Sequence, residues 1–264
     1  VSAMIGVALQ ESRDLVVHNL THYITPYNIF EGSYRLFQTV EYWPEGTTFV
    51  SVVDPGVGSK RKSVVALTNK NQYIVTPDNG TLSFIKKHVG IKAVREISEV
   101  ANRRANTEHS YTFHGRDVYA YTGAKLAAGH ISFEEVGPEL SVEHIVEIPT
   151  VETEVGSDFV KGAIDILDVR FGSLWTSVTR EEFYTLLPEF GDRFEVTIYN
   201  NDMLVYQNQV TYGKSFADVR IGQPLLYINS LYRVGLAINQ GSFAKAYNVG
   251  VGQNWHIEIR RIVN

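Results

Sequence analysis

The stretch TFVSVVDPGVGSKRK, residues 48–62, decides how the first part of this chain is interpreted. Its apolar residues Phe49, Val50, Val52 and Val53, three of them β-branched, are typical of a short buried strand that stops at Asp54. Pro55 cannot extend a sheet ladder, and the glycines after it allow a tight turn. We therefore expect the Asp54 carboxylate just beyond the carboxyl end of the strand, the edge at which open α/β sheets bind ligands.

Two further polar residues are candidates to join Asp54. Arg61 comes seven residues later, after a turn that can fold it back towards the carboxylate. His114 lies in a second glycine-containing loop, before a predicted helix rich in small residues over 118–128. The alternative is structural: Asp54 and Arg61 would be surface residues of a glycine-rich connection, and His114 a helix-start or turn residue.

The composition indicates a soluble globular protein with a small-molecule partner. A length of 264 residues, with 44% apolar and 12% aromatic residues, allows one large or two ordinary domains. The net charge of -5 and the lack of a Lys/Arg stripe argue against nucleic acid, and no apolar run approaches the roughly 18 residues of a membrane span. The absence of cysteine excludes disulfides and fits a reducing compartment, so we expect a cytoplasmic location.

Strand and helix patterns alternate in the first half of the chain, which predicts an α/β fold. We assign residues 1–148 to an N-terminal α/β domain with a central sheet flanked by helices. Strands are predicted over residues 15–22, 49–53, 63–67, 73–75 and 94–97. Helices are predicted over residues 2–10, 31–42, 77–88 and 118–128. The first of these looks like a small-residue helix and not like a signal peptide.

The second half has a different pattern. The acidic run EIPTVETEVGSD lacks a clear period, so residues 149–157 are predicted to be a linker. Residues 158–264 are assigned to a smaller C-terminal all-β, barrel-like domain, because short strands follow one another closely. These strands are predicted over residues 160–167, 194–199, 204–210, 225–229, 234–238 and 255–259.

Several polar motifs have a structural interpretation. His18 and His22 are four residues apart but fall on a predicted strand, and the chain has no H-E-x-x-H, so no metal site is expected. Arg116 and Asp117 are interpreted as an ion pair or helix-start charges. Asn79-Gly80 is most simply a turn.

In the second domain, DVRFGSLWTS (residues 168–177) follows a strand and combines an acid, two aromatic residues and a glycine. By itself this motif is also compatible with a hairpin in which Phe171 and Trp175 pack into the core.

Taken together, these stretches resemble the S-adenosylmethionine (SAM) hydroxide adenosyltransferase family, related to the fluorinase and chlorinase enzymes. The matching pieces, in chain order, are THYITP, PEGT, VVDPGVGSKR, PDNG, TFHGRD, DVRFGSLWTS, YINS and AINQGS. The resemblance implies a homotrimer with active sites between one subunit's first domain and a neighbour's second. It also implies attack of water or hydroxide on the 5′ carbon of SAM, giving adenosine and methionine. No cofactor is implied, since SAM is the substrate, and the adenosine product can co-purify.

The family's water-activating set matches Asp54, Arg61 and His114. Water, with a pKa of 15.7, and an ordinary Asp, with a pKa near 3.9, differ by about 12 units, or roughly 16 kcal/mol. Proton transfer must therefore be concerted with C–O bond formation. Either Asp54 or His114 accepts the proton while Arg61 orients Asp54.

The resemblance also implies residues that hold the substrate. Asp168 matches the acid that pairs with the methionine ammonium, and Ser230 matches a hydroxyl near the methionine carboxylate. The walls around ribose and methionine match Tyr27, Thr112, Phe113 and Trp175.

The chain departs from the family pattern at two places. The family's opening strand ends in Thr-Asp-Phe-Gly, with an acid that grips the ribose, and this sequence begins just past that position; either a start is omitted or ribose binding is impaired. Ser173 stands where the family usually has an Asn that faces the adenine. The base is then left to backbone groups near Asn239 and Gln240, or to water.

The sequence leaves two rivals to the hydrolase open. A halide-using relative would need a pocket of small and hydroxyl residues, and Gly115 lacks the hydroxyl found in the fluorinase. The other rival is a module that binds SAM or adenosine without turnover.

Overall fold

The computed structural model describes residues 1–168 and 170–262. Val169, within the DVRFGSLWTS motif, and residues 263–264, at the end of the predicted β domain, lie outside the described residues. The chain divides into two compact units, unit 1 (Val1–Ile148) and unit 2 (Pro149–Asn264).

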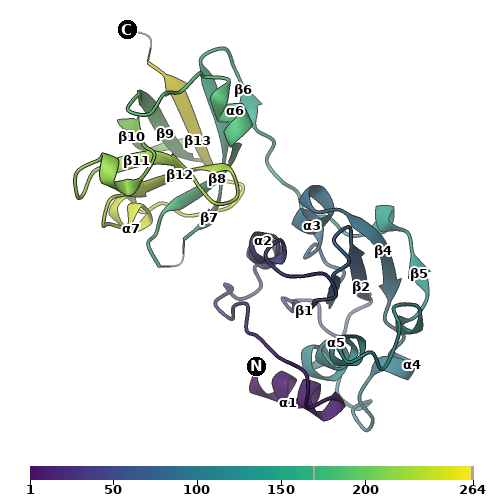
Figure 1. The fold of residues 1–264 in the computed structure, drawn as a ribbon. Coiled ribbons are helices and arrows are strands. Elements are labelled where there is room, and N and C mark those ends of the chain that lie inside the picture. Colours follow the sequence, from purple (N-terminus) through teal and green to yellow (C-terminus); the bar gives the residue numbers. More distant parts are fainter. Residues whose placement is uncertain (169, 263–264) are drawn as a thin grey trace. The chain divides into compact units, whose positions relative to one another are not determined.

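Unit 1 is built from short strands and helices that alternate along the chain (Figure 1). The helices are α1 (Ser2–Glu11), α2 (Ile29–Val40), α3 (Ser83–His88), α4 (Glu99–Asn102) and α5 (Tyr121–Ala127). A π-helical turn η1 (Gly115–Ala120) precedes α5, and the 3₁₀ turns are η2 (Glu134–Val136) and η3 (Val142–His144). The strands are β1 (Thr48–Val50), β2 (Ser63–Thr68), β3 (Tyr73–Pro77), β4 (Ile91–Glu96) and β5 (Glu139–Leu140).

In the described part of unit 1 the strands form one sheet in the order β1-β3-β2-β4-β5. Only the β1–β3 pair among them is parallel; the others are antiparallel. Because side chains alternate along a strand, Val50 faces α5, where Gly123 brings the helix backbone close, while Phe49 packs edge-on against Trp43. The predicted α/β domain, with a central sheet flanked by helices, is confirmed.

Two predicted strands of unit 1 differ in the structure. No strand forms over residues 15–22; these residues line an apolar cleft of about 550 Å³ beside β1 instead of pairing with it. β1 ends at Val50, earlier than predicted, because the chain then turns into the Asp54 loop, where the Val53 carbonyl accepts a hydrogen bond from Asn79 Nδ2 at 2.9 Å. The predicted helix over 118–128 begins earlier, as η1, directly after His114.

Strands are the main regular elements of unit 2. They are β6 (Glu154–Val155), β7 (Phe159–Leu167), β8 (Leu174–Thr179), β9 (Arg193–Asn200), β10 (Met203–Tyr212), β11 (Pro224–Ile228), β12 (Arg233–Ile238) and β13 (Trp255–Arg261). The helices are α6 (Arg180–Tyr184) and α7 (Phe243–Tyr247), with a 3₁₀ turn η4 (Phe216–Asp218).

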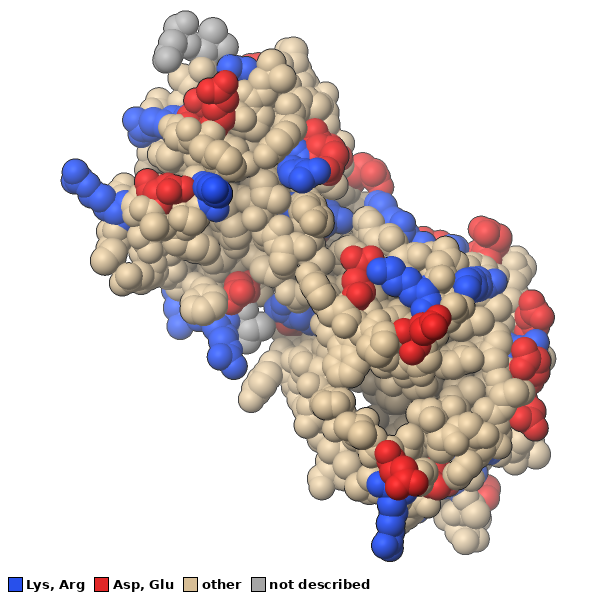
Figure 2. Space-filling view, in the orientation of Figure 1, with Lys and Arg blue, Asp and Glu red and all other residues tan. Residues whose placement is uncertain are grey.

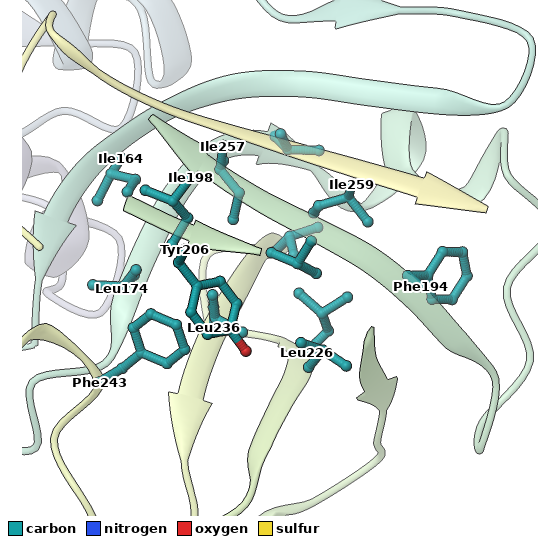
Figure 3. Packing of buried hydrophobic residues seen from close by; sticks show 14 of the residues in the cluster. Ile164, Leu174, Phe194, Ile198, Tyr206, Leu226, Leu236, Phe243, Ile257 and Ile259 are labelled. Carbon is teal, nitrogen blue, oxygen red and sulfur yellow. The ribbon is translucent and has the colours of Figure 1, made fainter. Parts of the chain in front are cut away.

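Among the described residues, the unit 2 strands follow the order β13-β9-β10-β11-β12-β8-β7-β6, and β13 also pairs with β7. That last pairing closes β7 to β13 into a barrel, which confirms the barrel-like prediction. Its interior is filled by apolar side chains such as Ile164, Ile198 and Ile257 (Figure 3). β8 was not predicted as a strand, but it pairs antiparallel with β7, so the hairpin interpretation of the DVRFGSLWTS motif is correct in its backbone. Trp175 is buried as that interpretation requires, whereas Phe171 is exposed, so its predicted packing into the core is wrong.

Acidic and basic side chains are interspersed on the face of each unit that Figure 2 shows. Within the described residues, none of the helices has the length and apolar character needed to span a bilayer.

Candidate active site

Asp54 and Arg61 form a two-pronged ion pair in the loop after β1. Arg61 Nε donates to Asp54 Oδ1 at 2.8 Å, and Arg61 Nη2 donates to Asp54 Oδ2. The Arg61 side chain is only 11% exposed and the Asp54 side chain only 5%. The loop turns at Gly58, which has a positive φ and where a Cβ would lie 3.2 Å from the Tyr111 carbonyl oxygen. Each Asp54 oxygen can still accept a further hydrogen bond, because a carboxylate has about four acceptor sites.

His114 is buried next to this pair, at the start of η1. Its Nδ1 lies 3.2 Å from Arg61 Nη2, and its Nε2 lies 2.9 Å from Nη2 of Arg103. Burial lowers the pKa of His114 below its usual value; the Arg103 and Arg61 guanidiniums lower it too, whereas Glu99 and Asp54 act in the opposite direction. The imidazole is therefore held neutral at pH 7.

Arg103 and Glu99 were missed by the sequence reasoning. Glu99 opens α4, a helix of four residues, and Arg103 directly follows it. One sequence signal could have found them. Glu99 and Arg103 are four residues apart, a spacing that favours an ion pair on a helix, and they lie shortly before the TFHGRD motif. The structure places this pair against the far side of the His114 ring.

Two more missed residues support Arg61. Arg61 Nη1 donates to Ser63 Oγ at 3.0 Å, and Ser63 Oγ hydrogen-bonds to the Tyr119 hydroxyl at 3.0 Å. The Arg61 guanidinium also lies over the Tyr119 ring, 5.6 Å from its centroid. Burial raises the pKa of Tyr119, so the phenol stays protonated and can act only as a neutral partner. These contacts hold the Arg61 guanidinium group in place without a ligand.

The PDNG motif does more than form a turn. Asn79 holds the Val53 carbonyl immediately before Asp54, and its Oδ1 accepts from Thr81 Oγ1 at 2.8 Å. Asp78 is buried and accepts from the Val146 N–H at 3.0 Å; burial raises the pKa of its carboxyl. The motif thus fixes the backbone that carries Asp54.

Arg116 and Asp117 form the structural ion pair that the sequence suggested. Arg116 donates to both Asp117 oxygens at 2.7 Å, and the Asp117 side chain is fully buried. Among the described residues, no group of three or more acidic or histidine side chains is arranged to hold a metal ion.

Three predicted wall residues of unit 1 are exposed: Tyr27, Thr112 and Phe113. Tyr27 adopts a positive φ of 68°, a conformation unusual for a bulky residue. Phe113 precedes His114, and its ring lies 5.0 Å from the Arg116 guanidinium carbon.

Three of the predicted binding residues of unit 2 lie in one loop and on the strand after it. Asp168 Oδ1 accepts from the Arg170 and Phe171 N–H groups, each at 2.9 Å, which shapes the loop. Ser173 and Trp175 are 3% and 8% exposed.

Tyr227 on β11 contacts Trp175 on β8. Trp175 Nε1 donates to the Tyr227 hydroxyl at 3.0 Å. Gly235 on β12 makes room for the Tyr227 ring, since a Cβ there would lie 2.6 Å from it. Tyr227 is another residue that the sequence reasoning missed, because its partners lie on separate strands.

The remaining predicted contacts follow β11 and β12. Ser230 is exposed, and the neighbouring Asn229 is buried, with a side-chain nitrogen that has no partner in the described residues. Asn239 Nδ2 donates to the Val219 carbonyl at 2.9 Å, and Gln240 is exposed with a positive φ. Within each unit, then, the structure gathers Asp54, Arg61 and His114, and separately Asp168, Ser173 and Trp175; their chemical roles stay predictions.

The fold and these contacts define a class: a two-unit protein with a carboxylate–guanidinium–imidazole cluster after a strand of the α/β unit and a barrel with polar loops. Comparison with known families identifies the class. Residues 1–137 match the SAM hydroxide adenosyltransferase N-terminal domain, and residues 162–256 match the C-terminal domain of the same family. The chain belongs to the SAM hydroxide adenosyltransferase family, as the sequence motifs predicted.

Individual relatives support this family assignment. The chain is 30% identical over 257 residues to the (R)-S-adenosyl-L-methionine hydrolase of Thermus thermophilus, covering 96% of this chain and 91% of that protein. It is 26% identical over 273 residues to a fluorinase of Actinopolyspora mzabensis, covering 94% and 89%. The structure is similar to the crystal structure of an uncharacterized conserved protein from Thermotoga maritima, with a TM-score of 0.90 and 30% identity over 98% of this chain and 94% of that one.

Proposed function

We propose that this protein is an enzyme that hydrolyses SAM to adenosine and L-methionine. The family membership and the relatives named SAM hydrolase support the reaction. The observation that carries the mechanism is the contact chain from Asp54 through Arg61 to His114, buried at the end of a strand.

In the proposed step, a water oxygen forms a bond to the ribose 5′ carbon as the carbon–sulfur bond breaks. The electron pair of that bond goes to the sulfonium sulfur, which leaves as the neutral thioether of methionine. Asp54 accepts the water proton as the C–O bond forms. We assign this role to Asp54 because both ring nitrogens of His114 face guanidinium groups. Arg61 orients the carboxylate and stabilises its charge.

Substrate holding is assigned to both units. Asp168 is proposed to pair with the methionine ammonium and Ser230 to bind its carboxylate, with adenine near Ser173, Asn239 and Gln240. The walls are proposed to be Tyr27, Thr112, Phe113 and Trp175. We further propose a homotrimer in which one subunit's unit 1 meets a neighbour's unit 2, a cytoplasmic location, and a reaction that uses no cofactor. Light scattering of the purified protein tests the trimer.

The reaction is tested by incubating the protein with SAM in halide-free buffer and quantifying adenosine and methionine by mass spectrometry. We expect equimolar products, and a loss of about 100- to 10,000-fold in rate for Asp54→Asn, the usual contribution of a positioned base. A halogenated 5′-deoxyadenosine formed only with added chloride or fluoride would identify the halide-using reaction instead. Tight SAM binding without turnover would identify a binding module.

A further inference from the structure

The His114 ring lies between two arginines, and only one of them belongs to the predicted catalytic set. Arg61 faces Nδ1, and Arg103 faces Nε2 at the shorter distance of 2.9 Å. The Arg103 side chain is 6% exposed.

Arg103 is itself held in place. Its Nε and Nη2 both donate to Glu99 Oε2, at 3.0 and 2.6 Å. Its Nη1 lies 3.4 Å from the Thr107 carbonyl oxygen and 3.3 Å from that of Ser110, on the segment that leads to His114. The guanidinium is thus fixed relative to the imidazole from several directions.

The hydrogen-bond donors around the His114 ring restrict its protonation state and its tautomer. A guanidinium can only donate, whereas a neutral imidazole has one donor and one acceptor nitrogen. Only one ring nitrogen can therefore accept, and only one of the two contacts can be a hydrogen bond. The shorter contact, from Arg103 to Nε2, requires the ring proton on Nδ1. A protonated ring could accept from neither arginine and would bring a third positive charge between them.

We propose that Arg103, anchored by Glu99, is a positioning residue that keeps His114 neutral with its proton on Nδ1 and its Nε2 lone pair engaged, so that the ring does not act as a base. The value of this role for catalysis rests on the proposed function. An imidazolium beside Asp54 would compete with water for the carboxylate and weaken the acceptor.

The charged and titratable groups around the ring make opposite predictions for two variants. Asp54 and Arg61 face it from the loop after β1, Glu99 and Arg103 from α4 and its end, and Tyr119 from η1, with ring centroids 6.4 Å apart. Removing the Arg103 charge raises the pKa of His114, whereas removing the Glu99 charge lowers it further. A loss of packing alone would not give opposite signs.

The test is an NMR titration of the full chain with ¹⁵N-labelled histidine, which needs no turnover. The chain has 8 histidines, so the His114 signals are assigned by their loss in His114→Gln. We expect the Nδ1–H tautomer in the unaltered protein, a titration midpoint at higher pH in Arg103→Met, and one at lower pH in Glu99→Gln. Arg104→Met is the matched control, because Arg104 contacts Asp117 and Gln10 instead of the ring.

An Nε2–H tautomer, or midpoints that move in the same direction in both variants, would overturn the proposal. If Arg103→Met does not fold, Glu99→Gln still decides, since the Glu99 side chain is 38% exposed. With turnover established, the acidic limb of the kcat profile should shift to higher pH in Arg103→Met while KM stays unchanged. An inactive unaltered protein would refute the proposed function without affecting the titration result.

Discussion

The two units bury their side chains in contrasting ways. At the end of β1, unit 1 gathers carboxylate, guanidinium and imidazole groups within hydrogen-bond distance, with Asp54 and Arg61 shielded from water. The barrel of unit 2 fills its interior with aliphatic and aromatic side chains, and its candidate binding residues lie in loops or at strand ends. The contrast suggests that unit 1 carries the bond-breaking step, while the barrel provides a stable frame for substrate-holding loops.

Of the changes that contrast the two units, Arg61→Lys should have the largest effect. It keeps the charge but removes the planar guanidinium that donates to both Asp54 oxygens. We expect product formation to fall by about 100- to 1,000-fold, the scale found when one preorganised charged or polar contact to a reacting group is lost. Initial rates of adenosine release measure this. Arg13→Lys, on an exposed arginine, is the control. Rates within about threefold of the unaltered enzyme would show that charge alone, and not fork geometry, matters.

Ile257→Ala should affect the stability of unit 2. Ile257 is fully buried on β13, so the cavity left behind should lower the free energy of unfolding by about 2 to 5 kcal/mol. Urea denaturation in a Trp43→Phe background measures it, because the remaining tryptophans, Trp175 and Trp255, both lie in unit 2.

The matched control for this prediction is Ile221→Ala, on an isoleucine of the same unit that is 70% exposed. It should change the free energy of unfolding by no more than about 0.5 kcal/mol. Equal costs for the two isoleucines would contradict the assignment of unit 2 stability to the barrel interior.

Tyr227→Phe tests how much a polar contact inside unit 2 stabilises the fold. The change leaves the buried Trp175 N–H without its acceptor, at a cost of about 1 to 3 kcal/mol. The same denaturation experiment measures it. In a Trp175→Phe background, Tyr227→Phe should lower the free energy of unfolding by less. If the effects of the two substitutions are strictly additive, the hydrogen bond does not stabilise the fold.

The smallest effect is a pH dependence of unit 1. Because the pKa of His114 is lowered in the folded protein, mainly by burial, the unfolded chain binds more protons as pH falls through the ordinary histidine range near about 6.5. Unit 1 should therefore lose stability as pH decreases through that range. Hydrogen exchange of unit 1 peptides, compared with His114→Gln at each pH, should show a shallower slope in the variant. Identical slopes would mean that His114 does not titrate differently in the two states.

Local patterns predicted much of the fold. Apolar runs gave most strands of both units, and the Asp54-Pro55-Gly56 sequence indicated a turn after β1. The failures have physical causes. Residues 15–22 have strand-like composition, but a strand also needs a neighbouring backbone, and here they line the cleft beside β1. β8 follows the polar Asp168 loop so closely that its strand character was hidden.

The candidate site was predicted only where neighbours in sequence or family motifs pointed to it. Asp54 and Arg61 share one loop, so their contact could be expected from spacing. Arg103 and Tyr119 could not be expected, because they reach the cluster through the placement of α4 and η1, which no local pattern encodes. Tyr227 was missed for the same reason, since the register of β11 against β12, and of β12 against β8, decides which side chains meet.

The π-helical turn η1 makes the position of His114 sensitive to chain length. A π-helical turn holds one more residue than an α-helical turn, and such turns are frequent at functional sites. Deleting one residue between Gly115 and Ala120 would let an ordinary helix continue into α5. Each helical residue turns the chain by about 100°, so the imidazole would swing away from both arginines while the composition of the segment hardly changed. The cluster therefore depends on the count of residues in this turn as well as on their identity.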